Sequence, residues 1–237
     1  MDVVALWRYP VKSLQGERLE TVAVRPEGLE GDRQFAIYDV STGYGLTARR
    51  MPELLFASAR LRDDGSPEVT LPDGTVADDD DALSTWLGRP VELRSSATDA
   101  ARHYENVDDF EQESVSGWSP FDGAAGAFHD NPGARVSLVS SATVGSWDVR
   151  RFRPNIVVDG GGEDALVGSS VTVGEATLDV GMRIKRCVMT TRAQAGSIER
   201  DLDVMRTIAR ERDACLSVGG LVAASGRVRL GDALQAG

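Results

Sequence analysis

The chain has 237 residues, 41% of them hydrophobic, which is enough for one large domain or two closely packed small ones. Its 37 acidic and 26 basic residues give a net charge of -11, which argues against a nucleic-acid partner and against an anionic membrane surface. With only two cysteines and two histidines, the chain has neither a disulfide framework nor a histidine-rich zinc or iron site.

The N-terminal residues and the spread of apolar residues indicate a cytoplasmic protein. Residues 1–7 lack the basic region and the long apolar run of a secretory signal peptide. No stretch of the chain reaches the ~20 consecutive apolar residues that a membrane span needs. Cys187 and Cys215 do not form a CxxC pair, so we expect reduced thiols, with Cys215 a buried core residue.

The pattern of apolar residues predicts a mostly β fold with a few helices. Short alternating or β-branched runs are separated by turn residues throughout the chain, and the Pro-Asp-Gly-Thr turn at 72–75 indicates a hairpin. We expect strands over residues 17–24, 34–40, 68–71, 90–94, 135–139, 155–158, 170–173, 176–180, 184–191 and 227–230.

Three helices are expected between these strands. The first covers residues 82–87, because the four aspartates at 78–81 complement the dipole of a helix N-terminus and Gly88 suits a C-cap. The second begins at Ser140-Ser141 and runs toward Trp147, and the third spans residues 198–212 with Ser197 as its N-cap and apolar residues on one face.

A shift in composition divides the chain into two predicted modules, residues 1–96 and 97–237. Residues 97–131 are polar and rich in glycine, and they are typical either of a long loop near a site or of a partly disordered linker.

Residues 160–165 match the G-x-G-x-x-A pattern of a dinucleotide-binding loop after a strand. That loop needs a helix directly after the glycines, whereas residues 167–174 have the pattern of a turn and a strand. We therefore interpret the glycines as a surface loop.

The segment 185–191 is the most informative for chemistry. On a strand, Lys185, Cys187, Met189 and Thr191 would share one face. The cations of Lys185 and Arg186 adjoin the thiol in sequence and favour its thiolate, which is a soft ligand for a transition metal. A lone cysteine on a strand can equally be a small core residue.

Basic residues gather at the starts of three predicted strands. They occur in the segments 9–13, 31–33 and 150–155, which contribute Lys12, Arg33 and Arg153 among others. Guanidinium and ammonium groups together with hydroxyl and amide groups suit a large anionic ligand that bears a phosphate. The alternative for each basic residue is a solvated surface charge.

Six segments in order resemble the MOSC-domain family. They are YPVKS (9–13), EGDRQFAIYD (30–39), TARRMPEL (47–54), RFRPNIVVDG (151–160), RCVMTTR (186–192) and GRVRLGD (226–232). The chain is most similar to members with an additional N-terminal β-barrel module, such as the mitochondrial amidoxime-reducing component and its bacterial relatives.

The resemblance implies an α+β, mostly β fold in which a barrel-like MOSC domain packs with a smaller N-terminal β module. It also implies a molybdenum cofactor (molybdenum–molybdopterin) bound between the two, with Cys187 as the metal ligand and catalytic residue. The implied cofactor-binding residues are Lys12, Ser13 and Arg33 around the pterin phosphate, Ser140 and Ser141 at a helix N-terminus, Arg153 and Asn155 of the RPN sequence, and Thr190 and Thr191 after the ligand.

The activity implied by the resemblance is the reduction of N-hydroxylated or N-oxidised small molecules. The chain has no cysteine cluster for an iron–sulfur module, so electrons would come from a separate flavin, haem or iron–sulfur reductase. No general acid is evident, and the nearest candidates are Asp122, His129 and Asp130.

Two other functions remain open. The chain could be a non-catalytic carrier of molybdenum cofactor or sulfur, or a scaffold with a vestigial pocket. Residues 192–196 replace an aspartate-proline segment that follows the Thr-Thr pair in many relatives, which leaves substrate specificity open.

Overall fold

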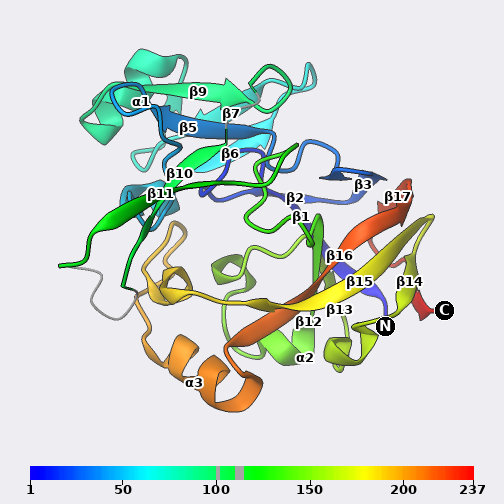
Figure 1. Ribbon diagram of the computed structural model, residues 1–237. Coiled ribbons are helices and arrows are strands. Elements are labelled where there is room, and N and C mark those ends of the chain that lie inside the picture. The colour runs from blue at the N-terminus through cyan, green and yellow to red at the C-terminus, as the bar shows by residue number, and fades with distance from the viewer. Residues whose placement is uncertain (100–101, 110–114) are drawn as a thin grey trace.

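The computed structural model describes residues 1–99, 102–109 and 115–237 (Figure 1). Strands dominate and a few short helices lie between them, so the predicted mostly β, α+β class is confirmed. No helix among the described residues is long and apolar enough to cross a membrane.

The largest element is an eight-stranded sheet to which both ends of the chain contribute. Its strand order is β18-β14-β15-β16-β12-β13-β1-β2, with a single parallel pair, β12 with β13. Its strands are β1 (Val3–Arg8), β2 (Glu17–Leu19), β12 (Val136–Ser140), β13 (Ile156–Val158), β14 (Ser170–Val173), β15 (Ala176–Lys185), β16 (Cys215–Ala224) and β18 (Leu234–Ala236).

A small sheet closes the core of this large sheet. It consists of β17 (Gly226–Arg229), β3 (Thr21–Arg25) and β4 (Gly28–Leu29). Val22, Val24 and Val228 point into one apolar cluster with residues of the large sheet such as Leu6 and Ile156. Burial of this much aliphatic surface is the main stabilising term for this half of the molecule.

A second apolar core lies at the top of Figure 1. It is built from residues such as Leu14, Ile37, Leu54 and Leu83, and every one of its buried members falls between residues 11 and 91. The elements around it are β5 (Phe35–Asp39), β9 (Val91–Ser95), β6 (Ser58–Leu61), β7 (Pro67–Thr70), β8 (Val76–Ala77), the 3-10 helix η1 (Pro52–Phe56) and α1 (Asp80–Leu87).

Helix α1 forms where the acidic run predicted it. The Asp79 side chain accepts a hydrogen bond from the backbone N–H of Ala82 at 2.9 Å and caps the N-terminus. Gly88 ends the helix with φ 65°, a left-handed conformation that glycine adopts without strain.

A hairpin joins the two cores, where a long loop was predicted. Its strands are β10 (His103–Val107) and β11 (Trp118–Asp122). Tyr104 packs with Tyr38 and Phe128 in a small buried aromatic group, while its strand neighbours are polar. The prediction of a loop over residues 97–131 was therefore wrong in this part, because buried and exposed residues alternate there without an apolar run.

Five short helices follow β12 along the chain. They are α2 (Ser141–Val144), η2 (Val149–Arg151), η3 (Glu163–Leu166), η4 (Val188–Thr191) and α3 (Asp203–Arg212). Helices α2, η2 and α3 share an apolar cluster that includes Phe152 and Leu216.

Helix α3 begins later than predicted, and Ser197 is not its N-cap. The segment before it is a loop in which Gln194 bridges to Ile198 and the N–H of Asp201 donates to the carbonyl of Thr191 at 2.8 Å. Ile198 is buried in this loop, so its apolar side chain does not belong to the helix face.

Candidate functional site

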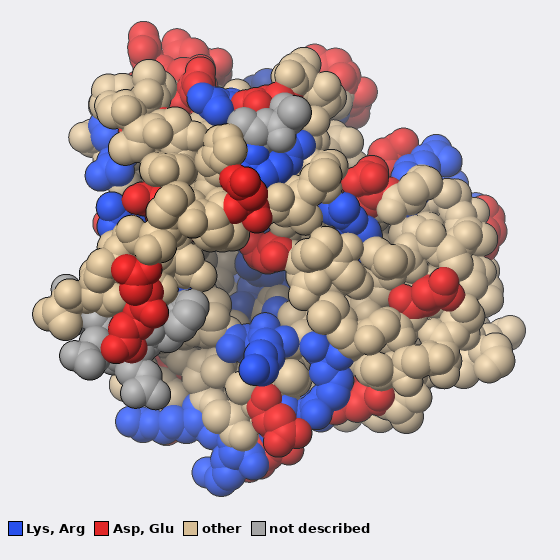
Figure 2. All heavy atoms as spheres, in the orientation of Figure 1, with Lys and Arg blue, Asp and Glu red and all other residues tan. Residues whose placement is uncertain are grey.

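A cavity of about 510 Å³ lies between the two cores and opens to solvent. Figure 2 shows it as a hollow in the face of the molecule, with lysine and arginine side chains near its mouth. Seven predicted site residues line it: Lys12, Ser13, Arg33, Arg153, Asn155, Cys187 and Thr190. Segments that are far apart in the sequence therefore meet around one cavity, which is large enough for a sizeable ligand.

Cys187 lies just after strand β15 and its side chain is exposed. The predicted strand over 184–191 was wrong beyond Lys185, since residues 188–191 form the 3-10 helix η4. The Thr190 hydroxyl donates to the carbonyl of Cys187 at 3.0 Å, and the Thr190 N–H donates to the same oxygen at 3.1 Å. These bonds fix the backbone that carries the thiol.

Arg186 places a permanent positive charge beside that thiol. Its Nε donates to the carbonyl of Leu216 at 2.7 Å, its Nη1 to the carbonyl of Phe152 at 2.9 Å, and its Nη2 to the Ser217 hydroxyl. Burial lowers the pKa of Arg186 to about 10, and the nearby Cys187 opposes that shift. The guanidinium of Arg186 thus stays charged at neutral pH, next in the chain to Cys187.

Arg151 holds the loop that follows the cysteine. Its Nη1 donates to the carbonyls of Thr190 at 3.2 Å and Arg192 at 3.3 Å, and its Nη2 donates to the carbonyl of Glu199 at 2.5 Å. The sequence contains three arginines between residues 150 and 153, but nothing in their spacing distinguishes this anchoring role from cofactor contact.

Lys12 is the most enclosed cation of the cavity. Its side chain is 7% exposed and its Nζ donates to the carbonyl of Phe128 at 3.2 Å. The same ammonium forms an ion pair with Asp130, a residue that also lines the cavity. A buried ammonium with a single carboxylate partner is a suitable contact for an anionic ligand.

Arg33 and Arg153 both line the cavity and both lie against the ring of Tyr9. Their guanidinium carbons lie 5.3 and 4.4 Å from the centre of its ring. Arg33 is paired with the buried carboxylate of Asp32, and Arg153 donates to the carbonyl of Leu14. Burial lowers the pKa of Arg153 to about 10, with repulsion from Arg33 adding to the shift, so both groups stay charged at neutral pH.

Three residues of the cavity wall have left-handed backbone conformations. Ser13, Arg33 and Arg153 have φ values of 71°, 52° and 51°. Such conformations are unfavourable for residues other than glycine and persist where the surrounding structure enforces them, often at functional sites. Three of the seven described non-glycine residues with positive φ therefore lie on this one wall.

Asn155 lines the cavity, but its amide is engaged within the protein. Its Oδ1 accepts from both the N–H and the hydroxyl of Ser137 at 3.0 Å, and its Nδ2 donates to Asp32 at 3.0 Å. Asn155 therefore positions Asp32, and through it Arg33.

Ser140, Ser141 and Thr191 are not brought to the cavity wall. The Ser140 hydroxyl donates to the buried Glu163 carboxylate at 2.6 Å, and the Thr191 hydroxyl donates to the carbonyl of Val188 at 2.7 Å. Ser141 is exposed at the start of a four-residue helix. The sequence correctly predicted the helix start, but not that Glu163 would engage its cap.

Ser140→Ala is expected to lower the free energy of unfolding by about 1–2 kcal/mol, because the N-cap and a partner of a buried carboxylate are both lost. Chemical denaturation measures the stability. Binding of inorganic phosphate to the cavity should be unchanged, because Ser140 does not line it. A loss of anion affinity without a loss of stability would instead place Ser140 in the site.

The glycine-rich segment after β13 is not a nucleotide-binding loop. Gly160, Gly161 and Gly162 are exposed, and they lead into η3 and then β14 instead of a crossover helix. The interpretation as a surface loop is confirmed.

None of the three candidate acids is suited to donate a proton at neutral pH. Burial, aided by Arg33, lowers the pKa of His129 to about 4, and its Nε2 lies 2.9 Å from the carbonyl of Glu27. Asp130 is held ionised by its cationic neighbours. Asp122 does not line the cavity and pairs with His103 at 2.5 Å.

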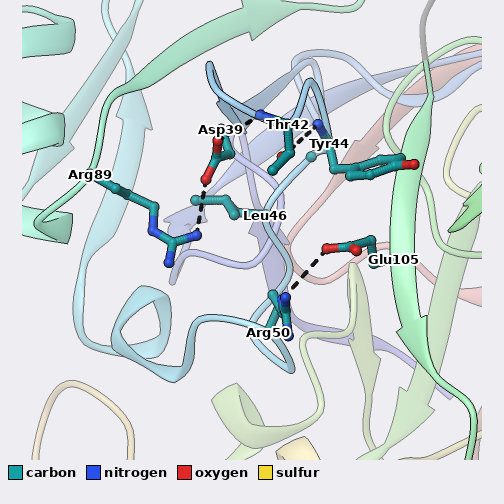
Figure 3. Close-up of a pocket in the computed structure, with 8 residues that line it drawn as sticks. Asp39, Thr42, Tyr44, Leu46, Arg50, Arg89 and Glu105 are labelled. Carbon is teal, nitrogen blue, oxygen red and sulfur yellow. Dashed lines mark hydrogen bonds and ion pairs between the residues drawn. The ribbon is translucent and has the colours of Figure 1, made fainter. Parts of the chain in front are cut away.

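A second, smaller pocket of about 30 Å³ adjoins the cavity (Figure 3). Its charged groups are already paired, Arg89 with Asp39 at 3.0 Å and Arg50 with Glu105 at 3.5 Å. The space suits one water molecule, so we assign it no ligand.

Within the described residues, no group of three His, Cys, Asp or Glu side chains could hold a metal ion. Cys187 is exposed at the cavity, whereas Cys215 is buried, as predicted for a core residue.

The comparisons with known proteins cover both halves of the chain. The model of the MOSC N-terminal beta barrel domain matches residues 1–116, and that of the MOSC domain matches residues 125–235. The predicted boundary at residue 96 stays a prediction.

Two curated relatives are similar over most of the chain. The molybdenum cofactor sulfurase of Drosophila grimshawi is 27% identical over 247 aligned positions, which cover 89% of this chain and 30% of that protein. The molybdenum cofactor sulfurase 2 of Aedes aegypti is 27% identical over 218 positions, which cover 81% of this chain and 26% of that protein. The chain therefore spans less than a third of the length of either relative.

Two solved structures are distantly similar. The YUAD protein from Bacillus subtilis has 10% identity and a TM-score of 0.45, with 98% of this chain and 93% of that one covered. YiiM from Geobacillus stearothermophilus has 13% identity and a TM-score of 0.38, with 58% of this chain and 73% of that chain covered.

Proposed function

Because the chain belongs to the family of MOSC-domain proteins with a MOSC N-terminal beta barrel domain, we propose that it binds molybdenum–molybdopterin in this cavity and reduces N-hydroxylated or N-oxidised compounds there. The Cys187 thiolate is the protein ligand of the metal in this proposal. The observation that carries it is the exposed thiol on the wall of a cavity lined by lysine and arginine.

The residues present fit such a cofactor in charge and in ligand type. Lys12, Arg33 and Arg153 offer positive charge to a phosphate on one side of the cavity, while Cys187 offers a soft ligand on another segment of its wall. Hydroxyl and amide groups of the wall, such as Ser13 and Gln194, can bond the polar edges of a pterin.

Each residue has a defined task in this proposal. Arg186 contributes a positive charge beside the thiol, Thr190 and Arg151 hold its loop, and Lys12 and Arg33 neutralise the ligand's phosphate. When bound, the cofactor supplies the electron pair that removes oxygen from an N–OH group. The electrons come from a separate flavin, haem or iron–sulfur protein, and we propose the cytoplasm as the compartment.

Reduction of an N–OH group to N–H and water by an electron pair also consumes two protons. His129 is neutral and its Nε2 is engaged with a backbone carbonyl, and Asp130 is ionised. Since the cavity opens to solvent, water is the expected proton source.

Two measurements on protein made in a cofactor-producing host test the proposal. Loaded protein with a chemical reductant should convert an amidoxime to the amidine, and Cys187→Ser should lose this turnover while Cys215→Ser keeps it. Such turnover would eliminate a purely carrier function. Protein that contains no molybdenum would contradict both functions and leave a scaffold with a vestigial pocket.

One observation favours the second candidate function, a carrier of molybdenum cofactor or sulfur. Both curated relatives are named molybdenum cofactor sulfurases, and the similarity covers over four-fifths of this chain. Tight cofactor binding without amidoxime reduction would support the carrier function.

A further inference from the structure

One carboxylate projects into the cavity among its cations. The Asp130 side chain is 85% exposed, whereas the Lys12 side chain that it pairs with is 7% exposed. Its exposed surface faces the cavity that it lines. An anionic ligand that reached Lys12 would therefore meet this carboxylate first.

The two residues before Asp130 are held by hydrogen bonds. The N–H of Phe128 donates to the carbonyl of Arg33 at 2.7 Å, and the Phe128 carbonyl accepts from Lys12 at 3.2 Å. The His129 ring is buried and its Nε2 lies 2.9 Å from the carbonyl of Glu27. These contacts hold the backbone that leads into Asp130, and they bring it close to Lys12.

The other groups of the cavity do not compete for this contact. Asp130 and Glu105 are the carboxylates among the described lining residues, and Glu105 pairs with Arg50 at 3.5 Å. Enclosure by the cavity walls would raise the pKa of Asp130, but Lys12, and after it Arg33 and Arg153, outweigh this and hold that pKa below its usual range.

We propose that Asp130 occupies the ammonium of Lys12 in the free protein and thereby weakens the binding of anionic ligands that need this contact. Its carboxylate satisfies Lys12, so an incoming anion gains the contact only by displacing it. A phosphate monoester dianion interacts with each cation about twice as strongly as a monoanion does. The attraction of the cations therefore offsets this displacement more readily for a dianionic phosphate than for a carboxylate or another monoanion.

A cationic ligand is the opposite possibility for an exposed carboxylate. Lys12, Arg33 and Arg153 all act on Asp130, so a cation placed there would meet three positive charges. The proposal rests on the same cavity as the proposed function, but it concerns only the competition of anions with Asp130 for Lys12.

Binding of inorganic phosphate and of acetate to the cofactor-free full chain at pH 8 tests this competition for Lys12. Asp130→Asn should raise phosphate affinity about tenfold and acetate affinity by no larger a factor, because the displacement is removed for both anions and repulsion by the carboxylate acts more strongly on the dianion. Asp130→Ala gives a second variant with the same expectation. Isothermal titration calorimetry at fixed ionic strength measures both affinities.

Asp122→Asn is the matched control, because it removes one exposed carboxylate without touching the cavity wall. It should change either affinity less than about twofold. Unchanged or weaker phosphate binding in both Asp130 variants would overturn the proposal, as would an equal gain in Asp122→Asn. Neither probe requires molybdenum, so this result is independent of the metal content that tests the proposed function.

Discussion

Cys187→Ser protein from a cofactor-producing host is expected to contain less than about a tenth of the molybdenum of the unchanged protein. Loss of a direct ligand should cost at least the 10- to 100-fold affinity that loss of an outer-shell partner costs. Serine keeps the size and the exposed position of the side chain but is a hard, weakly acidic ligand. Elemental analysis per mole of purified protein measures the effect.

The control for this change is Cys215→Ser. Cys215 is buried and its Sγ lies 3.6 Å from the carbonyl of Asp213, so its replacement should leave metal content within about twofold. Equal molybdenum in Cys187→Ser and the unchanged protein would show that the thiol is not a ligand.

Asp32→Ala is expected to lower the free energy of unfolding by about 3–5 kcal/mol, the usual cost of leaving a buried charge without its partner. The Asp32 carboxylate is fully buried and accepts from the N–H of Tyr9 at 2.7 Å, from Asn155 at 3.0 Å and from Arg33. Its removal leaves all three donors without this acceptor.

Urea denaturation with Asp63→Ala as control measures this effect. Asp63 is exposed, so its change should stay within about 0.5 kcal/mol. A loss below about 1 kcal/mol in Asp32→Ala would mean that water or another group replaces the carboxylate. The same variant should weaken phosphate binding, because Asp32 orients Arg33.

Local signals were sufficient for some elements of the fold. The four aspartates and Gly88 predicted helix α1 because caps act on their own turn. The 184–191 segment shows the limit of such reasoning. Its β-branched residues favour a strand, but bonds from Arg151, some 40 positions away in the chain, hold it as a 3-10 helix.

The candidate site, like the fold, could be predicted from the sequence only in part. Segments carrying Lys12, Arg33, Arg153 and Cys187 could be selected from the sequence, because their order along the chain resembles a family. Their meeting at one cavity is a tertiary property. The pairing of Ser140 with Glu163 and the position of Asp130 at Lys12 depend on side chains brought together across 23 and 118 residues, for which no local pattern exists.

Alkylation of Cys187, followed by mass spectrometry on cofactor-free and cofactor-loaded protein, tests the central claim most directly. Cys187 is exposed and should react readily in the cofactor-free protein, while the buried Cys215 gives the background rate in both samples. The account predicts that Cys187 is protected in step with the molybdenum bound. Equal alkylation of Cys187 in protein that keeps its molybdenum would contradict it.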